Sequence, residues 1–168
     1  MVLSTIPVSK NGKTVAVHWA TGMRNHGVVE VEVEQQEDRE ILAELAAIRY
    51  LVFDRQVFGR KPVRGNGYEL RVYTGAIKKL LRKCSQKQHL IQHSLFLSRS
   101  LGGVMINVIK QKITDPIFGP ADTWISDSIC LDGTAEVSWD TAIGSLVITE
   151  HALSRFESRS NLQNAGQI

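Results

Sequence analysis

Lysines and arginines in the middle of the chain form the group of residues best suited to binding an anion. From Arg60 to Lys87 the sequence holds nine basic residues against one acid, Glu69. Such a local excess creates a positive potential that attracts phosphate, and each neutralised phosphate adds salt-dependent affinity. The segment is therefore a candidate nucleic-acid interface, and the predicted contacts are Lys78, Lys79, Arg82, Lys83, Arg64 and Arg71. Because aromatic residues are sparse here, the alternative is a solvated basic face beside a complementary acidic one.

Carboxylates form the second group of residues that could support chemistry, because Mg²⁺ prefers oxygen ligands. From Val28 to Ala47 there are seven acids against one base. Those at positions 30, 32 and 34 alternate with valines, which is typical of the solvated face of a strand. The candidate metal ligands are instead Glu44, in a predicted helix, and Asp115 and Asp122, which follow the last predicted core strand together with Asp127. Each of these three aspartates is also suited to a turn or a helix cap.

The histidines and cysteines give weaker signals. His89 and His93 have the i, i+4 spacing that suits a metal-binding helix face. Without a glutamate at the adjacent position they do not form the zinc-protease motif, and surface positions on a helix explain them. Cys84 and Cys130 lack metal-ligand spacing and are too few for a disulfide framework, so we expect free thiols.

A hairpin and a helix must position the acids of the N-terminal half. The runs 13–22 and 29–34 predict an antiparallel hairpin, in which the valines of the second run line one buried face. Residues 37–52 change to a helical period, with an apolar stripe from Ile41 to Val52 and Glu44 at its edge. Acids in the first turn agree with the helix dipole.

The basic segment is predicted to span a loop, a strand and two helices. The loop covers 59–67, the strand runs directly into a helix from Ala76, a second helical run ends at Gly102-Gly103, and 104–110 forms a buried strand. Three elements are expected beyond these: a hairpin about Asp132-Gly133, a strand at 144–149 and a helix at 149–159. That last helix would carry His151, Arg155 and Arg159 on one face, which could meet phosphate or form a salt-bridged stripe.

Length and composition predict one globular domain. The chain has 168 residues, 43% of them hydrophobic and 22% charged, and a formal net charge of +3. We expect an α/β fold with a mixed β-sheet and packed helices. Its core is expected at residues 1–125, with a hairpin and helix extension at 126–160 packed on the same domain and a frayed tail at 161–168. No apolar run approaches the roughly 20 residues that span a bilayer, so we expect a cytoplasmic protein with no membrane partner.

Two stretches resemble the ribonuclease H-like superfamily over residues 13–125. The run "REILAELAAIRYLV" resembles the first helix of that fold, where a glutamate lies at the catalytic cleft and Glu44 is the matching residue. The run "LRVYTGAIKKLL" resembles the following strand and helix, where the family reads Tyr-Thr-Asp-Ser before the helix. Aligning "WATG" with the family's Thr-Asp-Gly pattern places Thr21 at the first aspartate, and Gly75 matches the second.

The resemblance implies two-metal phosphodiester hydrolysis in the family, but two of its central carboxylates are missing here. We therefore expect a nucleic-acid-binding protein, for DNA or RNA, with a degenerate nuclease centre and no cofactor. By analogy it would serve a mobile element or a DNA-processing complex. One alternative is an Mg²⁺-dependent nuclease with a rearranged set drawn from Glu44, Asp115, Asp122 and Glu150. The other is a protein-interaction module, since a homo-oligomer could pair its acidic and basic faces.

Overall fold

The computed structural model describes residues 1–10, 12–110 and 112–131, and the two strands 137–141 and 144–148. The chain divides into two units, Met1–Leu131 and Asp132–Ile168. In the described residues no helix combines the length and the apolar character that crossing a bilayer requires.

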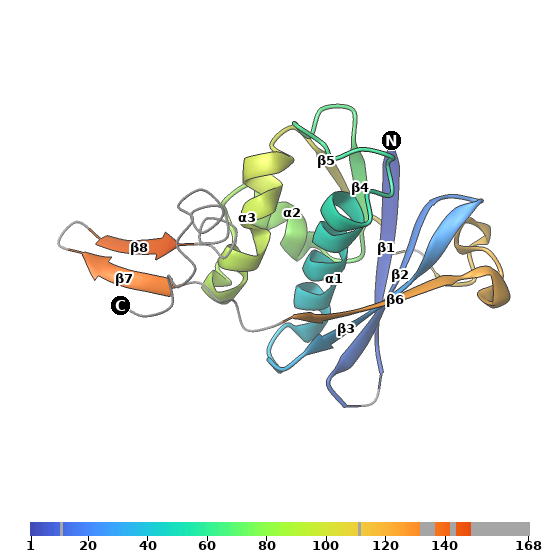
Figure 1. Ribbon diagram of the computed structural model, residues 1–168, viewed down its shortest axis with the longest axis horizontal. Helices are drawn as coiled ribbons and strands as arrows, with labels where there is room; N and C mark the ends of the chain where they lie inside the picture. Colours follow the sequence, from blue (N-terminus) through green and yellow to red (C-terminus); the bar gives the residue numbers. More distant parts are fainter. Residues whose placement is uncertain (11, 111, 132–136, 142–143, 149–168) are drawn as a thin grey trace, which may run out of the picture. The chain divides into compact units, whose positions relative to one another are not determined.

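A six-stranded mixed sheet organises the first unit and confirms the α/β class (Figure 1). Its strand order is β5-β4-β1-β2-β3-β6. β2 is antiparallel to β1 and β3, while β1 with β4, β4 with β5, and β3 with β6 are parallel. The strands are β1 (Val2–Ser9), β2 (Thr14–Gly22), β3 (Asn25–Val33), β4 (Glu69–Val72), β5 (Met105–Val108) and β6 (Ile125–Leu131). All strands except β2 therefore point the same way, and their carboxyl ends lie at one edge.

Three helices lie on one side of this sheet (Figure 1). They are α1 (Arg39–Arg49), which continues into a π-helical turn (Tyr50–Asp54), α2 (Gly75–Leu81) and α3 (Ile91–Ser100). α1 packs on β1, β2 and β3, and α3 packs against both α1 and α2. The predicted hairpin, the helix after it, the strand before α2, the helix pair and the strand at 104–110 are confirmed.

The helical side of the sheet holds the main core. Val29, Val31 and Val33 are buried there, as the alternation predicts, and Trp19 and Leu45 are fully buried in the same cluster. At about 25 cal/mol for each Å² of apolar surface removed from water, this layer is the main source of stability.

Residues 113–124 cover part of the opposite face. Phe118 packs there against Ile6 and Ala20. Gly119 has a positive φ of 60° and lies so close to the His26 ring that an added Cβ would overlap it. The backbone therefore needs glycine at this position for two independent reasons. Trp124 ends the segment and donates from Nε1 to the Phe118 carbonyl at 2.7 Å.

β1 is central in the sheet, although the sequence analysis assigned no strand to it. Both of its faces are buried: Leu3 and Thr5 face the helices, while Ser4 and Ile6 face the other side. A strand buried on both faces has no alternation of apolar and polar residues. Pro7 further weakens the signal, and it is tolerated because β4 pairs only with Val2–Ser4.

One C-terminal strand pairs differently from the expectation. Residues 125–131 form β6, which pairs with β3 in the main sheet and not with the strand at 137–141 within the described residues, while the turn predicted at Asp132-Gly133 lies outside them. The first unit extends through 131. In the second unit β7 (Val137–Thr141) pairs with β8 (Gly144–Ile148), which confirms a strand at 144–148. The helix predicted at 149–159 and the tail at 161–168 lie outside the described residues.

Candidate nucleic-acid interface

Glu44 is the carboxylate at the centre of the helical side. It lies on α1, is fully buried, and its Oε1 accepts two hydrogen bonds. Thr5 donates from Oγ1 at 2.7 Å and Tyr73 donates from its backbone N–H at 2.9 Å. Glu44 therefore joins α1 to β1 and to the end of β4. Its second oxygen, Oε2, has no hydrogen-bond partner in the described part of the chain.

Burial dominates the electrostatics of Glu44. Loss of solvation raises the pKa of its carboxyl from 4.5 to about 7, while the hydrogen bonds from Tyr73 and Thr5 act in the opposite direction and lower it. The resemblance placed Glu44 at a cleft and the helix pattern placed it at the edge of the apolar stripe. The structure instead encloses it completely, so a ligand cannot reach its carboxylate without local opening.

Thr5, rather than Thr21, is the residue beside Glu44. The Thr21 hydroxyl lies at the end of the β2–β3 hairpin, where it accepts a hydrogen bond from the Asn25 side chain at 2.7 Å. Thr5 lies within β1, opposite Trp19 of β2. Thr21, which the resemblance matches to the family's first aspartate, therefore makes its hydrogen bonds within the hairpin and not to Glu44.

Gly75 is the first residue of α2, at the carboxyl end of β4. It is exposed, and a Cβ built on it would have no atom within 4 Å. Its φ lies outside the left-handed region, so another residue type meets neither a clash nor backbone strain. The glycine at the predicted second aspartate position is therefore not required by packing.

The candidate aspartates do not join Glu44. Asp115 precedes the 3₁₀ turn Pro116–Phe118, and its carboxylate accepts the Lys112 N–H at 3.0 Å. Asp122 is exposed in the next 3₁₀ turn. Both belong to the segment that covers the opposite face of the sheet. Asp127 forms an ion pair with Arg55. Glu150 lies outside the described residues.

Most of the predicted basic contacts are available on the surface. Lys79, Arg82, Lys83 and Arg64 are exposed and Lys78 is half-buried, and within the described ranges none of them has an ion-pair partner. Lys78 to Lys83 lie together on α2 and just after it, where Ile77 and Leu80 turn into the core.

Two of the predicted contacts lie elsewhere. Arg64 belongs to the loop before β4, at the opposite end of that strand from α2. Arg71 pairs with Glu69, Nε to Oε1 at 2.8 Å, and this pair projects from the face of β4 opposite to the buried Leu70 and Val72. The charge of Arg71 is thus already matched.

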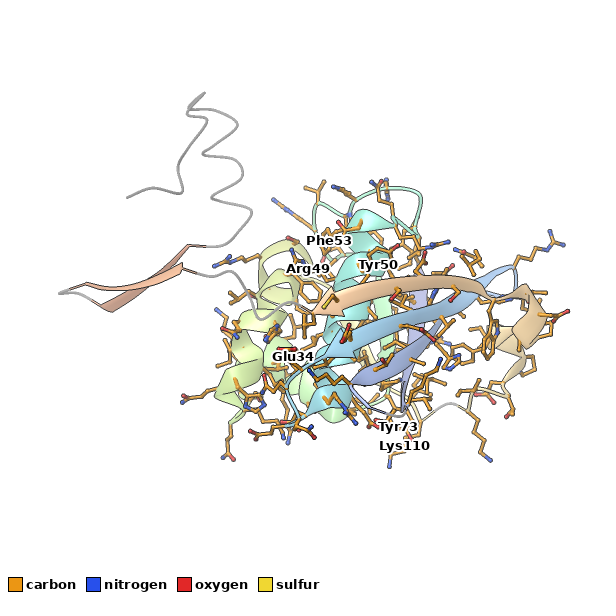
Figure 2. All side chains as sticks on the ribbon, turned by 60° about the horizontal axis from the view of Figure 1, so that its bottom comes forward. Glu34, Arg49, Tyr50, Phe53, Tyr73 and Lys110 are labelled. Carbon is orange, nitrogen blue, oxygen red and sulfur yellow. The ribbon has the colours of Figure 1, made fainter. Side chains whose placement is uncertain are left out.

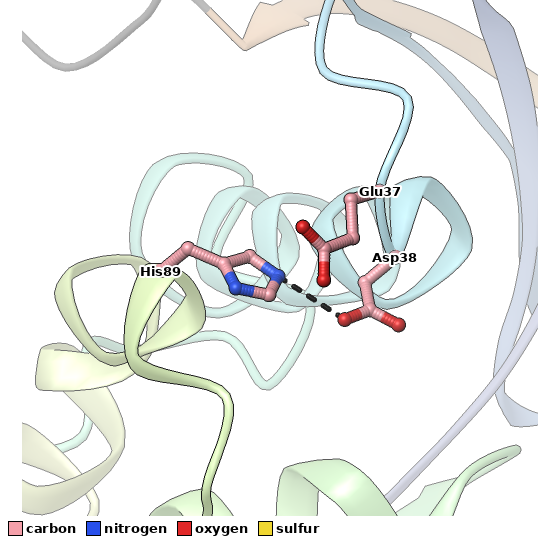
Figure 3. A group of neighbouring side chains, drawn as sticks. All are labelled: Glu37, Asp38 and His89. Carbon is pink, nitrogen blue, oxygen red and sulfur yellow. Dashed lines mark hydrogen bonds and ion pairs between the residues drawn. The ribbon is translucent and has the colours of Figure 1, made fainter.

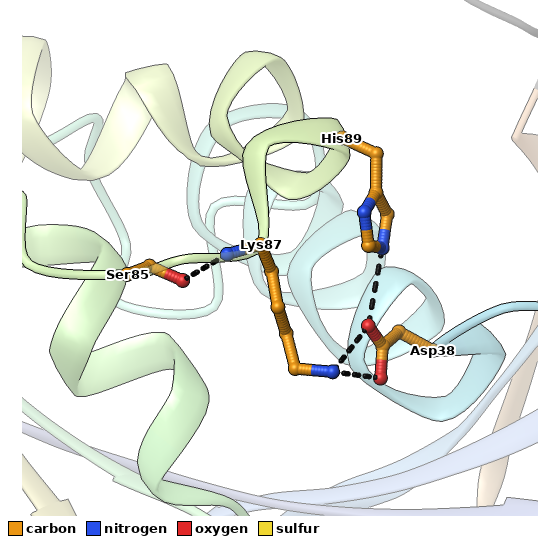
Figure 4. Close-up of polar contacts among 4 residues, drawn as sticks. All are labelled: Asp38, Ser85, Lys87 and His89. Carbon is orange, nitrogen blue, oxygen red and sulfur yellow. Dashed lines mark hydrogen bonds and ion pairs between the residues drawn. The ribbon is translucent and has the colours of Figure 1, made fainter.

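One further cluster has the composition of a cation site. The ligand atoms of Glu37, Asp38 and His89 lie within 4.8 Å of one another (Figure 3). Lys87 already occupies this position with its ammonium group, 2.7 and 2.6 Å from the two Asp38 oxygens (Figure 4). His89 completes the arrangement, with Nε2 at 3.1 Å from Asp38. The cluster therefore ties the start of α1 to the start of α3. His93 does not belong to it.

Sequence reasoning missed two basic residues at the carboxyl end of β5. Lys110 and Lys112 are exposed and have no ion-pair partner in the described segments. Figure 2 labels Lys110 beside Tyr73, and Ile109 donates its N–H to the Val72 carbonyl, so both strand ends share one edge. A signal was present in the sequence, since Lys110 ends the strand predicted at 104–110 and Lys112 follows it.

Comparison with family models, curated proteins and solved structures gives no match for this chain.

Proposed function

We propose that the protein binds nucleic acid on a ribonuclease H-like scaffold whose nuclease centre is degenerate. The order of elements supports the scaffold: hairpin, helix, strand, pair of helices and strand follow one another along the chain as the resemblance implies. The proposal rests chiefly on one observation. Glu44 is the one carboxylate of the described residues that is bonded to both β1 and the end of β4, while the next acid on this side of α1, Glu40, is exposed and accepts a hydrogen bond from Ser9.

A single enclosed carboxylate is a poor site for two divalent ions. Two such ions repel one another strongly at close range, and one acid leaves most of that repulsion uncompensated. Glu44 also stays largely protonated up to about neutral pH, because burial raises its pKa. The exposed bases of α2 remain suited to phosphate, which needs no metal.

A gel-shift series with and without Mg²⁺ tests the proposal. Binding should be independent of Mg²⁺ and steeply salt-dependent, and no substrate should be cut. The variant with alanine at Lys78, Lys79, Arg82 and Lys83 should bind more weakly, and the slope of log affinity against log salt should flatten by roughly 0.7 to 0.9 for each phosphate that is no longer neutralised. Alanine at Lys10 and Lys13, which pair with Glu30 and Glu34, is the matched control.

Two results would contradict the proposal. If parent and quadruple variant have the same affinity and the same slope of log affinity against log salt, the basic helix is only a solvated face. Mg²⁺-dependent cleavage that Glu44→Gln abolishes would establish the nuclease alternative instead.

A further inference from the structure

The edge of the sheet at which the carboxyl ends of all strands except β2 lie is divided into an acidic and a basic half. β3 leads there into α1, and this half carries Glu34, Glu37, Asp38 and Glu40. β4 and β5 end at the same edge, and their half carries Lys78, Lys79, Lys110 and Lys112. Because the parallel strands fix which ends meet, this separation follows from the topology.

The two halves also differ in how far their charges are matched. On the acidic side, Glu34 pairs with Lys13 and Asp38 with Lys87. On the basic side, none of the four lysines has an ion-pair partner in the described part of the chain. Asp115 accepts the Lys112 backbone N–H and keeps its negative charge close to that lysine. The uncompensated charge of the basic half is therefore that of Lys78, Lys79 and Lys110.

Gly75 leaves open space within this basic half. It lies three residues after the end of β4 and precedes Lys78 by less than one helical turn, and the volume where its side chain would lie is empty to 4 Å. A ligand backbone can approach the main chain closely where no side chain intervenes. Glu44 is fully buried beneath this edge, so its carboxylate does not face such a ligand.

We propose that this edge, formed by Lys78, Lys79 and Lys110 around Gly75, is a metal-independent binding site for the phosphodiester backbone of a nucleic acid. The ammonium groups neutralise the phosphates, and no divalent ion bridges them to the protein. On the acidic half Glu37 and Glu40 have no ion-pair partner in the described residues, and their charges disfavour the same backbone there. The inference rests on the proposed function and adds Lys110 and the open main chain at Gly75 to the contact.

Three variants of Gly75 isolate charge from shape. Gly75→Asp and Gly75→Asn have nearly the same size, and Gly75→Ala tests the added Cβ alone. Fluorescence anisotropy with labelled single-stranded and duplex DNA measures their affinities in EDTA and in Mg²⁺. We expect Gly75→Ala and Gly75→Asn to bind more weakly than the parent, because their side chains fill the open space. Gly75→Asp should bind about fivefold more weakly than Gly75→Asn, the effect of a carboxylate and a phosphate charge about 4 Å apart in water. Lys110→Gln should weaken binding, while Lys13→Gln on the acidic half should not.

The outcomes separate the inference from the function on which it rests. Equal affinity of Gly75→Asp and Gly75→Asn, or loss of parent binding in EDTA, overturns the site proposed at this edge while nucleic-acid binding stands. Absence of binding by the parent to any probe overturns both. Thermal melts of the three Gly75 variants check that they fold, which we expect because an exposed position in the first turn of a helix accepts each of these side chains.

Discussion

The substitution Glu44→Gln tests the buried carboxyl through the pH dependence of stability. In the folded parent the pKa of Glu44 is about 7, against the ordinary value of 4.5 in the unfolded chain. The folded state thus holds more protons than the unfolded state between these values. The contribution of Glu44 to stability is therefore greatest below pH 4.5 and falls as the pH rises, until the pH passes about 7.

The size of this loss follows from the pKa difference. At 1.36 kcal/mol for each pKa unit, ionising Glu44 in its buried site costs about 3 kcal/mol of unfolding free energy. Most of that loss, about 2 to 3 kcal/mol, should fall between about pH 5 and pH 8. Glutamine cannot ionise and keeps an oxygen that can accept from Thr5 and from the Tyr73 N–H, so the variant should lack this component.

Urea unfolding of parent and variant at half-unit steps of pH measures the difference. Because all other titrating groups are shared, subtracting the two curves isolates Glu44. The unfolding free energy of the variant minus that of the parent should increase steadily as the pH rises, and level off above about 7. Two curves that run parallel from about pH 5 to 8 would refute the reasoning, since they would mean that Glu44 is ionised and solvated throughout.

Three further changes test other parts of the structure. Leu45→Ala should cost roughly 2 to 5 kcal/mol in urea unfolding, because this side chain is fully buried beside Glu44. Gly119→Ala should lower the melting temperature through its positive φ and its overlap with His26, whereas Gly75→Ala should leave it nearly unchanged; equal effects would contradict the two placements. Thr5→Asp combined with Gly75→Asp should create Mn²⁺ affinity that calorimetry detects in the double variant and not in the parent, and two ions bound to the parent would exclude a degenerate centre.

Periodicity was sufficient to predict the elements that have one polar and one apolar side. β3 alternates valine and glutamate because one of its faces is solvated, and α1 repeats its apolar residues every three or four positions because one stripe packs on the sheet. β1 lacks both signals, since both faces are buried and Pro7 interrupts it. The contact of Thr5 with Glu44 therefore had no signal in the sequence pattern.

The candidate site was predictable in composition but less so in position. The run of bases identified α2, yet only the strand directions bring Lys110 to the same edge and send Arg64 to the opposite end. The burial of Glu44 could not be read from its helix, because a glutamate within an apolar stripe is as compatible with a cleft as with a closed core. Its two hydrogen-bond donors come from strands that are remote in sequence.

β6 is attached to the sheet along one side only. It pairs with β3 alone, and among the described residues Arg55 to Asp127 is its one ion pair. Local opening follows the density of buried contacts, so strands with one pairing partner are expected to open before the central ones. The chain therefore enters the second unit from a strand whose backbone hydrogen bonds in the sheet all depend on β3.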